Sequence, residues 1–299
     1  MRGPLVVKRA FSEPLLLLAA FGSILLATTT LVALTMYASS IAEAGVRRTM
    51  ETASYEQTAV TVSASVTAET FPKDDVSIRA ELAKAYPSTP AVTTSLRSDS
   101  YTMPGQEDRK LPELLRFGSY DGLDRQARLV SGAWPEPAAA EDEPVEAVIS
   151  LPAATATGFE TGREYTVRGR LDPRPVKVRV VGVFQLDDPF GARWAGEQLL
   201  STGVERRDFT TYGPLMVARE TFVGRFATSV NATWTAVPDL RAITPERLRP
   251  LAGAVAELGD RLKAAGCTGC ETASRLPEML AQLGTASLVA RSTMLIPVL

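Results

Sequence analysis

The pattern of apolar and polar residues divides the chain into one long apolar segment and a mixed remainder. Residues 14–42 contain no charged side chain, and residues 15–38 are almost continuously apolar. Roughly 20 apolar residues in a helix cross the hydrocarbon layer of a bilayer, so this run predicts a transmembrane helix over residues 15–38. Its three adjacent threonines, Thr28, Thr29 and Thr30, can donate their hydroxyls to helix carbonyls and do not oppose that interpretation.

The charged residues around this run indicate its orientation. Three Lys or Arg residues precede it, whereas Arg47 and Arg48 come after it beside glutamates. This bias favours a cytoplasmic N-terminus, residues 1–14, and an extracytoplasmic location for the bulk of the chain at the cell membrane. A cleaved signal peptide is the alternative, although its apolar region would be only about 7–15 residues long. Under either interpretation the part of the chain after the segment is exported.

Helical spacing continues beyond the apolar run to about residue 54, with charged residues on one face. We therefore expect the transmembrane helix to extend outward as a stalk. Residues 55–68 then change to an alternation of valine or alanine with threonine or serine, which is typical of a strand. Asp74 and Asp75 are expected to cap the start of the next helix, and Pro87 is expected to end that helix.

Strands and helices alternate along the rest of the chain. Two alternating runs, residues 164–171 and 176–186, are separated by an Asp-Pro turn and predict a β-hairpin. Apolar residues at helical spacing predict a long helix over residues 244–265. Further strands are expected over residues 91–101, 114–120, 145–150, 214–218 and 229–237, and short helices over residues 151–158, near 194 and over 220–226. Residues 39–285 are thus expected to form a mixed α+β extracytoplasmic domain of two lobes with stalk helices.

The last residues of the sequence, 286–299, are again largely apolar. One interpretation is the end of an amphipathic helix packed on its own domain. The other is a second stalk that returns to the membrane, with residues 286–299 as the truncated start of a second transmembrane helix. Because so short a run cannot cross a bilayer, the second interpretation predicts a natural chain that continues. The symmetry with the first apolar helix favours it.

Composition narrows the functional classes. The chain has 32 Lys or Arg against 34 Asp or Glu and a net charge of -2, which does not indicate a nucleic-acid partner. The absence of histidine removes the commonest general base and metal ligand. Neither GxxxxGK[ST] nor GxGxxG occurs. We therefore expect no catalytic, metal or cofactor site on this chain. Adjacent acidic pairs such as Asp187-Asp188 leave a surface enzyme as a third class, although caps, loops and turns explain them better.

The two cysteines, Cys267 and Cys270, are separated by two residues. A structural disulfide that closes the loop after a helix is the preferred interpretation, in an oxidising compartment. A reduced, inert pair and a redox CxxC motif are the alternatives. Half of a zinc site would lack its other ligands, because the chain has no further cysteine and no histidine.

Three segments occur in an order that resembles the extracytoplasmic part of FtsX-like or MacB-like ABC transporter permeases of the actinobacterial type. They are LVSGAWP, then VEAVISLPAATATGFETGREYTV, then VKVRVVGVFQLDDP. In such permeases a Gly-Trp-Pro turn precedes a strand, a short Ala-rich helix, two glycines and a hairpin that ends in VVGVF. The positions that match, all expected to be structural, are Gly132, Trp134, Pro135, Gly158, Gly162 and Gly182.

This resemblance implies a permease subunit, or its N-terminal part, in the lipid bilayer. It implies a separate cytoplasmic ABC ATPase, with the remaining permease helices or a second permease copy as further partners. It also implies that ATP-driven motion of the membrane helices passes through the stalk to the extracytoplasmic domain. A membrane-anchored extracytoplasmic sensor of a signalling protein has the same layout and is the alternative. Further membrane helices would indicate the permease, and a kinase or cyclase module the sensor.

Overall fold

The computed structural model describes residues 14–293 except 139, 141, 142, 173, 195, 229, 241 and 242, and it describes no side chain at 14, 16, 42, 245 or 286–293. Contacts between Cα atoms divide the chain into two units. The first takes in the chain up to Thr52, Leu240–Pro250 and the chain from Met279, and the second is Ala53–Asp239 with Leu251–Glu278. The predicted segments 1–14 and 286–299 lie largely outside the described residues, so both stay predictions.

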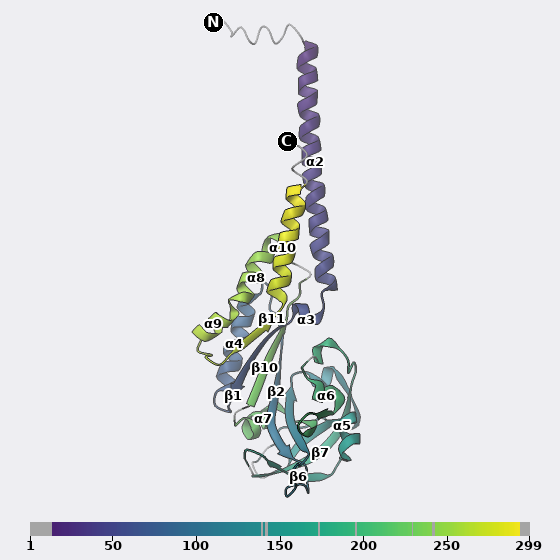
Figure 1. Cartoon of the computed structure of the whole chain (residues 1–299), viewed down its shortest axis with the longest axis vertical. Coiled ribbons are helices and arrows are strands. Elements are labelled where there is room, and N and C mark those ends of the chain that lie inside the picture. The colour runs from purple at the N-terminus through teal and green to yellow at the C-terminus, as the bar shows by residue number, and fades with distance from the viewer. Residues whose placement is uncertain are drawn as a thin grey trace. The chain divides into compact units, whose positions relative to one another are not determined.

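Helices and strands alternate along the chain and give a mixed α+β fold (Figure 1). The helices are α2 (Pro14–Thr52), α3 (Tyr55–Thr58), α4 (Phe71–Ala85), α5 (Leu151–Thr157), α6 (Gln198–Thr202), α7 (Arg219–Phe226), α8 (Leu248–Ala256), α9 (Leu258–Ala264) and α10 (Leu276–Thr293), with 3-10 turns η1 (Leu123–Arg125), η2 (Ala192–Trp194) and η3 (Pro245–Arg247). The strands are β1 (Val60–Val66), β2 (Ala91–Thr102), β3 (Leu114–Tyr120), β4 (Ala127–Gly132), β5 (Val145–Ser150), β6 (Glu164–Gly169), β7 (Pro175–Leu186), β8 (Val204–Arg206), β9 (Thr210–Met216), β10 (Val230–Val237) and β11 (Glu271–Ser274). The α+β class and the long apolar helix near the N-terminus are confirmed.

The strands belong to the second unit and form one mixed sheet in the order β11-β1-β10-β2-β3-β9-β5-β7-β4. Among the described strands, β3 with β9 and β5 with β7 pair in parallel, and the other pairs are antiparallel. The predicted hairpin is confirmed as β6 and β7, which pair antiparallel. Strand β6 also pairs with β2. A closed ring of strands therefore runs through β2, β3, β9, β5, β7 and β6 and back to β2. The expected division into two lobes stays a prediction.

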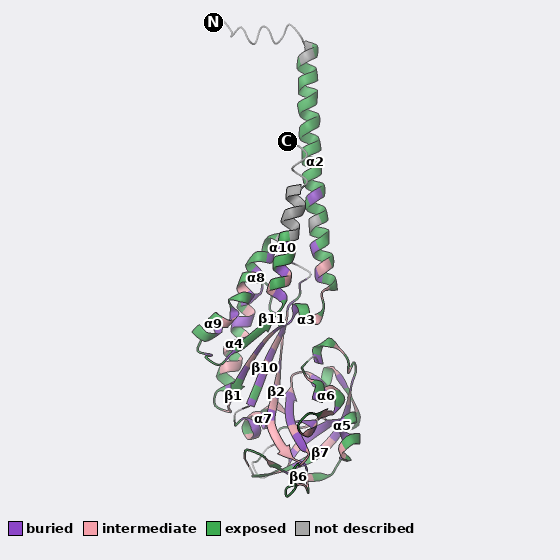
Figure 2. Cartoon of the chain, in the orientation of Figure 1, coloured by how far each residue is buried: buried purple, intermediate pink, exposed green. Residues whose placement is uncertain are grey.

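Strand β1 shows why the alternating pattern in the sequence becomes a half-covered strand. Its four apolar positions from Val60 to Val66 are buried, and the Thr and Ser positions between them are less so. Helix α4 packs on this part of the sheet (Figures 1 and 2) and places Ile78 and Leu82 fully in the core. On β10, Trp234 is also fully buried. The apolar face therefore faces the helix, as the period of two predicts.

Helix α4 begins earlier than the acidic pair predicts. Its N-cap is Thr70, and a proline lies in the first turn, where a missing backbone N–H costs nothing. Asp75 therefore lies inside the helix, and its expected role as a cap is wrong. Its carboxylate instead accepts a hydrogen bond from the indole nitrogen of Trp234 at 2.7 Å and pairs with Arg79 at 2.8 Å.

The long helix expected over residues 244–265 is wrong in one respect, because Glu257 interrupts it. The structure has η3, α8 and α9 in its place. The apolar positions that predicted the helix are nevertheless buried, including Leu248, Leu258 and Leu262. Arg261 explains how the break is tolerated: its guanidinium donates to the carbonyl of Ala254 at 2.7 Å, which supplies a partner where the helical ladder is interrupted.

Candidate functional site

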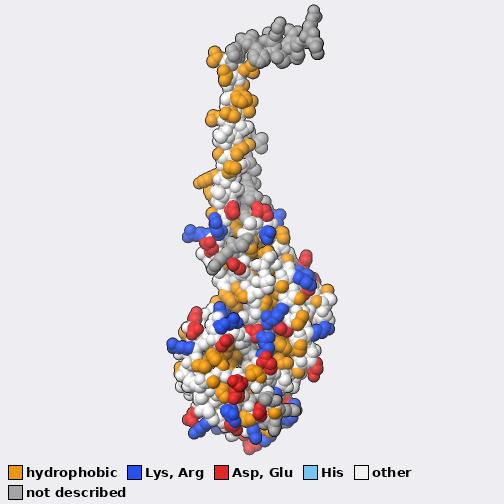
Figure 3. Space-filling view, turned by 180° about the vertical axis from the view of Figure 1, so that it is seen from behind, with side chains coloured by type: hydrophobic (Ala, Val, Ile, Leu, Met, Phe, Trp, Pro, Cys, Tyr) orange, Lys and Arg blue, Asp and Glu red, His pale blue; other side chains and the backbone are white. Residues whose placement is uncertain are grey.

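Helix α2 is a single helix of 39 residues. Among the residues that the structure describes, it is the one helix long and apolar enough to cross a membrane, over Leu17–Thr52. Figure 2 colours most of the segment without charges as exposed, and Figure 3 shows hydrophobic side chains on its surface. At 1.5 Å per residue the helix measures about 58 Å, whereas the hydrocarbon layer is about 30 Å thick. About half of α2 is thus available as an extension beyond a bilayer.

The hydroxyl groups inside the apolar part of α2 find partners within the helix. Thr28, Thr29 and Thr30 each donate to the carbonyl four residues earlier, at 2.7 to 2.8 Å. Ser23 donates in the same way, at 2.8 Å. A helix in hydrocarbon must satisfy its polar groups internally. The prediction that the three threonines return their hydroxyls to the backbone is confirmed.

The C-terminal half of α2 has one buried face. Ala38, Val46 and Met50 are each less than 10% exposed and lie at multiples of four residues, which places them on one side of the helix. Helix α2 contacts η3, which belongs to the same unit. Gly45 is on a side that no described residue covers, because none of their atoms lies within 4 Å of where its Cβ would be. This half of α2 is therefore a helix supported along one face.

Helix α10 joins the same unit as α2 from Met279 onward. Its Leu276 and Leu280 are fully buried and Gly284 is buried, with the side chain of Arg249 at 3.9 Å from a Cβ built there. The described part of α10 is thus packed at its start, and the helix runs on to Thr293.

The family-motif positions Gly132 and Gly182 face each other across the β4–β7 pair. Gly132 has φ of 77°, and a Cβ on it would lie 1.9 Å from the carbonyl oxygen of Val181. A Cβ on Gly182 would lie 2.6 Å from the carbonyl oxygen of Ala133. Two backbones cross here at a distance that only glycine allows. The register between β5 and β7 shifts at Val181, so β7 carries a bulge one residue before Gly182.

Trp134 and Pro135 come directly after this crossing and are half-buried. The Trp134 ring packs against a buried apolar cluster that includes Phe184, with 6.0 Å between the ring centroids. The tryptophan is therefore an edge of the core rather than its centre. Its position after the glycine crossing holds the start of the next irregular segment against β7.

Gly158 and Gly162 occupy the ends of a short connection. The expected short helix closed by Gly158 is confirmed: this glycine ends α5 with φ of 71°, and its N–H donates to the carbonyl of Ala154 at 2.8 Å. Gly162 has φ of 87° and its N–H donates to Val180 on β7 at 2.7 Å. Both glycines set chain direction, and neither is crowded, since no atom of a described residue lies within 4 Å of a Cβ at either position.

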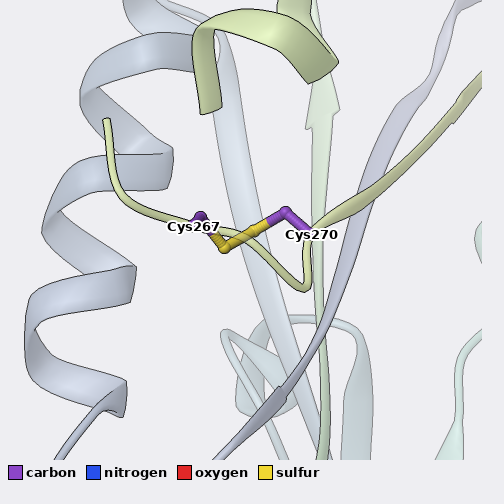
Figure 4. The surroundings of a disulfide bond; sticks show 2 residues. All are labelled: Cys267 and Cys270. Atoms are coloured by element: carbon purple, nitrogen blue, oxygen red, sulfur yellow. A yellow bond between two sulfur atoms is a disulfide. The ribbon is translucent and has the colours of Figure 1, made fainter. Parts of the chain in front are cut away.

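Cys267 and Cys270 are joined by a disulfide in the loop between α9 and β11 (Figure 4). Their Cα atoms are 5.5 Å apart, and each residue is 7% exposed. The N–H of Cys267 donates to the carbonyl of Leu262 at 2.9 Å, which ties the loop to the end of α9. A buried, bonded pair of this kind stiffens a loop and offers no accessible thiolate for redox exchange.

The sequence matches no family model and no curated protein. A structural comparison finds a domain of a protein from Porphyromonas gingivalis that is predicted to be a permease, with 13% sequence identity and a TM-score of 0.33. The match covers 73% of this chain and 89% of that domain. A similarity this low does not assign a family or an activity to this chain.

Proposed function

We propose that this chain is the N-terminal part of an ABC transporter permease of the FtsX/MacB type. In this proposal α2 crosses the cell membrane. The second unit, which contains the sheet and is called the sheet-bearing unit below, lies on the extracytoplasmic side. A separate cytoplasmic ATPase supplies the energy, and further permease helices or a second copy complete the pathway. The resemblance of three ordered sequence segments to such permeases suggests this class.

The observation that carries the proposal is the unbroken length of α2. Its apolar part suffices for a bilayer, and the same helix continues to Thr52 with a buried face. A continuous helix transmits an axial or tilting displacement, because a bend requires an identifiable break in its hydrogen-bond ladder. No proline lies within α2 after Pro14, so the sequence places no proline kink between the apolar part of the helix and its C-terminal half.

The cysteine pair supports export of the second unit. Disulfides persist in oxidising compartments and are rare in the cytosol, and Cys267 and Cys270 are bonded. The Lys and Arg bias around the apolar run favours the same orientation.

A topology experiment tests the export half of the proposal. Single cysteines are introduced at Ser12, before α2, and at Lys110, which is exposed in the second unit. A membrane-impermeant maleimide added to intact cells is expected to label position 110, and to label position 12 only after the cells are opened. Labelling in the reverse order would refute the proposed orientation.

Partner isolation tests the transport half. The full natural protein is tagged and purified from its own membranes in mild detergent. We expect an ATPase with a P-loop to co-purify and to hydrolyse ATP in a vanadate-sensitive manner. A kinase or cyclase module on the same polypeptide, without a co-purifying ATPase, would favour the sensor instead.

A further inference from the structure

A cavity of about 620 Å³ in the sheet-bearing unit is lined by an unusual number of arginines. Pockets that bind small molecules fall between about 300 and 1,000 Å³, so the size suits one ligand. Its wall holds four arginines and two carboxylates, which are Arg97, Arg116, Arg170, Arg207, Glu205 and Asp208. Within its own unit this is a concave surface where positive charge exceeds negative.

Two of the arginines are already committed. Arg97 pairs with Glu197 at 3.1 Å, and Arg207 pairs with Glu205 at 2.6 Å. Neither Arg116 nor Arg170 forms an ion pair with any residue that the structure describes. Asp208 also forms no ion pair with a described residue, so two arginines and one carboxylate of the wall lack an ion-pair partner there, and the excess positive charge lies on Arg116 and Arg170.

Arg116 is placed by irregular strand pairing. The register between β2 and β3 shifts between Arg116 and Gly118, where β2 carries an extra residue, and the register between β3 and β9 shifts across Arg116. Strand bulges of this kind redirect a side chain. Gly213, with φ of 108°, allows β9 to pass, since a Cβ there would lie 3.0 Å from the carbonyl oxygen of Arg116. The Nε atom of Arg116 is buried without a hydrogen-bond partner among the described residues, and such a group calls for a ligand or water partner.

Arg170 is held by an aromatic ring that packs against the flat face of its guanidinium. Its Cζ lies 4.7 Å from the centroid of the Phe209 ring. A cation over an aromatic face is stabilised by the ring, and the planar guanidinium keeps its N–H edges free for a bidentate contact with an oxyanion. The ring thus orients the group without neutralising it.

We propose that this cavity binds a small molecule through a phosphate or carboxylate group, with Arg116 and Arg170 as the anion-binding side chains. The buried Leu114 and Leu199 give the cavity an apolar wall for the remainder of the ligand. The inference does not depend on the proposed transport function, because the site lies wholly within the second unit and needs no ATPase.

Calorimetric titration of the full chain in an uncharged detergent tests this site at low ionic strength. The probes are pyrophosphate and citrate, which separate phosphate from carboxylate preference, and choline is the cationic control. The variants are Arg116→Gln and Arg170→Gln. Arg128→Gln is the matched control, since Arg128 is exposed on β4 and bonds only to Gln185 among the described residues.

We expect at least one anion to bind with a ratio of one to one and choline not to bind. A lost charge-assisted hydrogen bond should weaken binding about tenfold or more in each of the two site variants, and Arg128→Gln should leave the affinity within about twofold. Should Arg116→Gln lower the unfolding temperature, the exposed Arg170 decides the matter. Absence of anion binding up to roughly 10 mM, or equal affinity in wild type and Arg170→Gln, would overturn the proposal.

Discussion

Substituting Gly132 by alanine tests whether the glycine crossing of β4 and β7 is a close approach of two backbones. The added Cβ would lie 1.9 Å from the carbonyl oxygen of Val181 and 2.7 Å from the Cα of Gly182. Both are backbone atoms inside β7, so no flexible side chain can move aside. The substitution must separate the strands or abandon the positive φ of 77°.

The magnitude has two parts, and Gly158 separates them. A left-handed conformation costs a residue with a Cβ about 1–2 kcal/mol. Alanine at position 158, where φ is 71°, has that cost alone, because no atom of the residues that the structure describes lies within 4 Å of the Cβ position. Overpacking adds typically about 1–3 kcal/mol. We therefore expect Gly132→Ala to lower the free energy of unfolding by about 1–3 kcal/mol more than Gly158→Ala does.

Urea unfolding detected by tryptophan fluorescence measures this difference. All three tryptophans lie in the sheet-bearing unit, so the signal reports the unfolding of that unit. The two variants share the change in backbone preference, and the comparison isolates the collision between strands. Losses that agree within about 0.5 kcal/mol would refute the close approach.

Three further outcomes are expected from the described contacts. Trp234→Ala, at a fully buried site, should cost roughly 3–5 kcal/mol in urea unfolding and Trp134→Ala about half as much, because Trp134 is half-buried; equal losses would contradict this. Replacing Cys267 and Cys270 with serine should cost no more than about 2 kcal/mol, since the closed loop is short; unfolding of the variant at room temperature would contradict it. A hydrogen bond from Lys84 lowers the pKa of Glu81 below its ordinary 4.5, so the ionised Glu81 stabilises the fold above that pH and this stabilisation is lost as the pH falls below it. Glu81→Gln should therefore lose less stability than the wild type between neutral and acidic pH, and an equal loss in both proteins would exclude that role.

The sequence predicts elements whose signals are local. The alternation of β1 and the hairpin of β6 and β7 depend on a period of two, and both are present in the structure. The C-cap at Gly158 depends on one glycine after an apolar turn and is also present. In each case the residue types within a few positions determine the backbone conformation.

Features that depend on contacts between distant segments could not be predicted in the same way. The break at Glu257 leaves the apolar spacing intact, and it depends on a guanidinium that reaches back to Ala254. Asp75 has the composition of a cap, but its carboxylate accepts the indole N–H of Trp234, which lies 159 residues further along the chain. A strand as short as β8 has too few residues to show a period.

The cavity lined by Arg116 and Arg170 could not be predicted from the sequence for a related reason. Arg116 lies within β3 and Arg170 comes directly after β6, and neither belongs to a basic run. One signal is present: Arg116 interrupts a strand that is otherwise buried on both sides of it. A charged residue inside a buried strand is costly unless it has a partner, which makes it a candidate for function.

The central claim is that α2 transmits motion from the membrane to the sheet-bearing unit, and Gly45 offers the most direct test. Proline at position 45 removes a backbone donor inside the helix and costs about 3 kcal/mol or more, whereas alanine fits, since no atom of the described part of the chain lies within 4 Å of its Cβ. Both variants are assembled with the co-purified ATPase in lipid nanodiscs.

Amide hydrogen exchange of the sheet-bearing unit is then compared without nucleotide and after trapping with ADP and vanadate. We expect trapping to change the protection of this unit in the wild type and in Gly45→Ala, and to leave it unchanged in Gly45→Pro. No change on trapping in the wild type, or the same change in Gly45→Pro, would contradict transmission through α2.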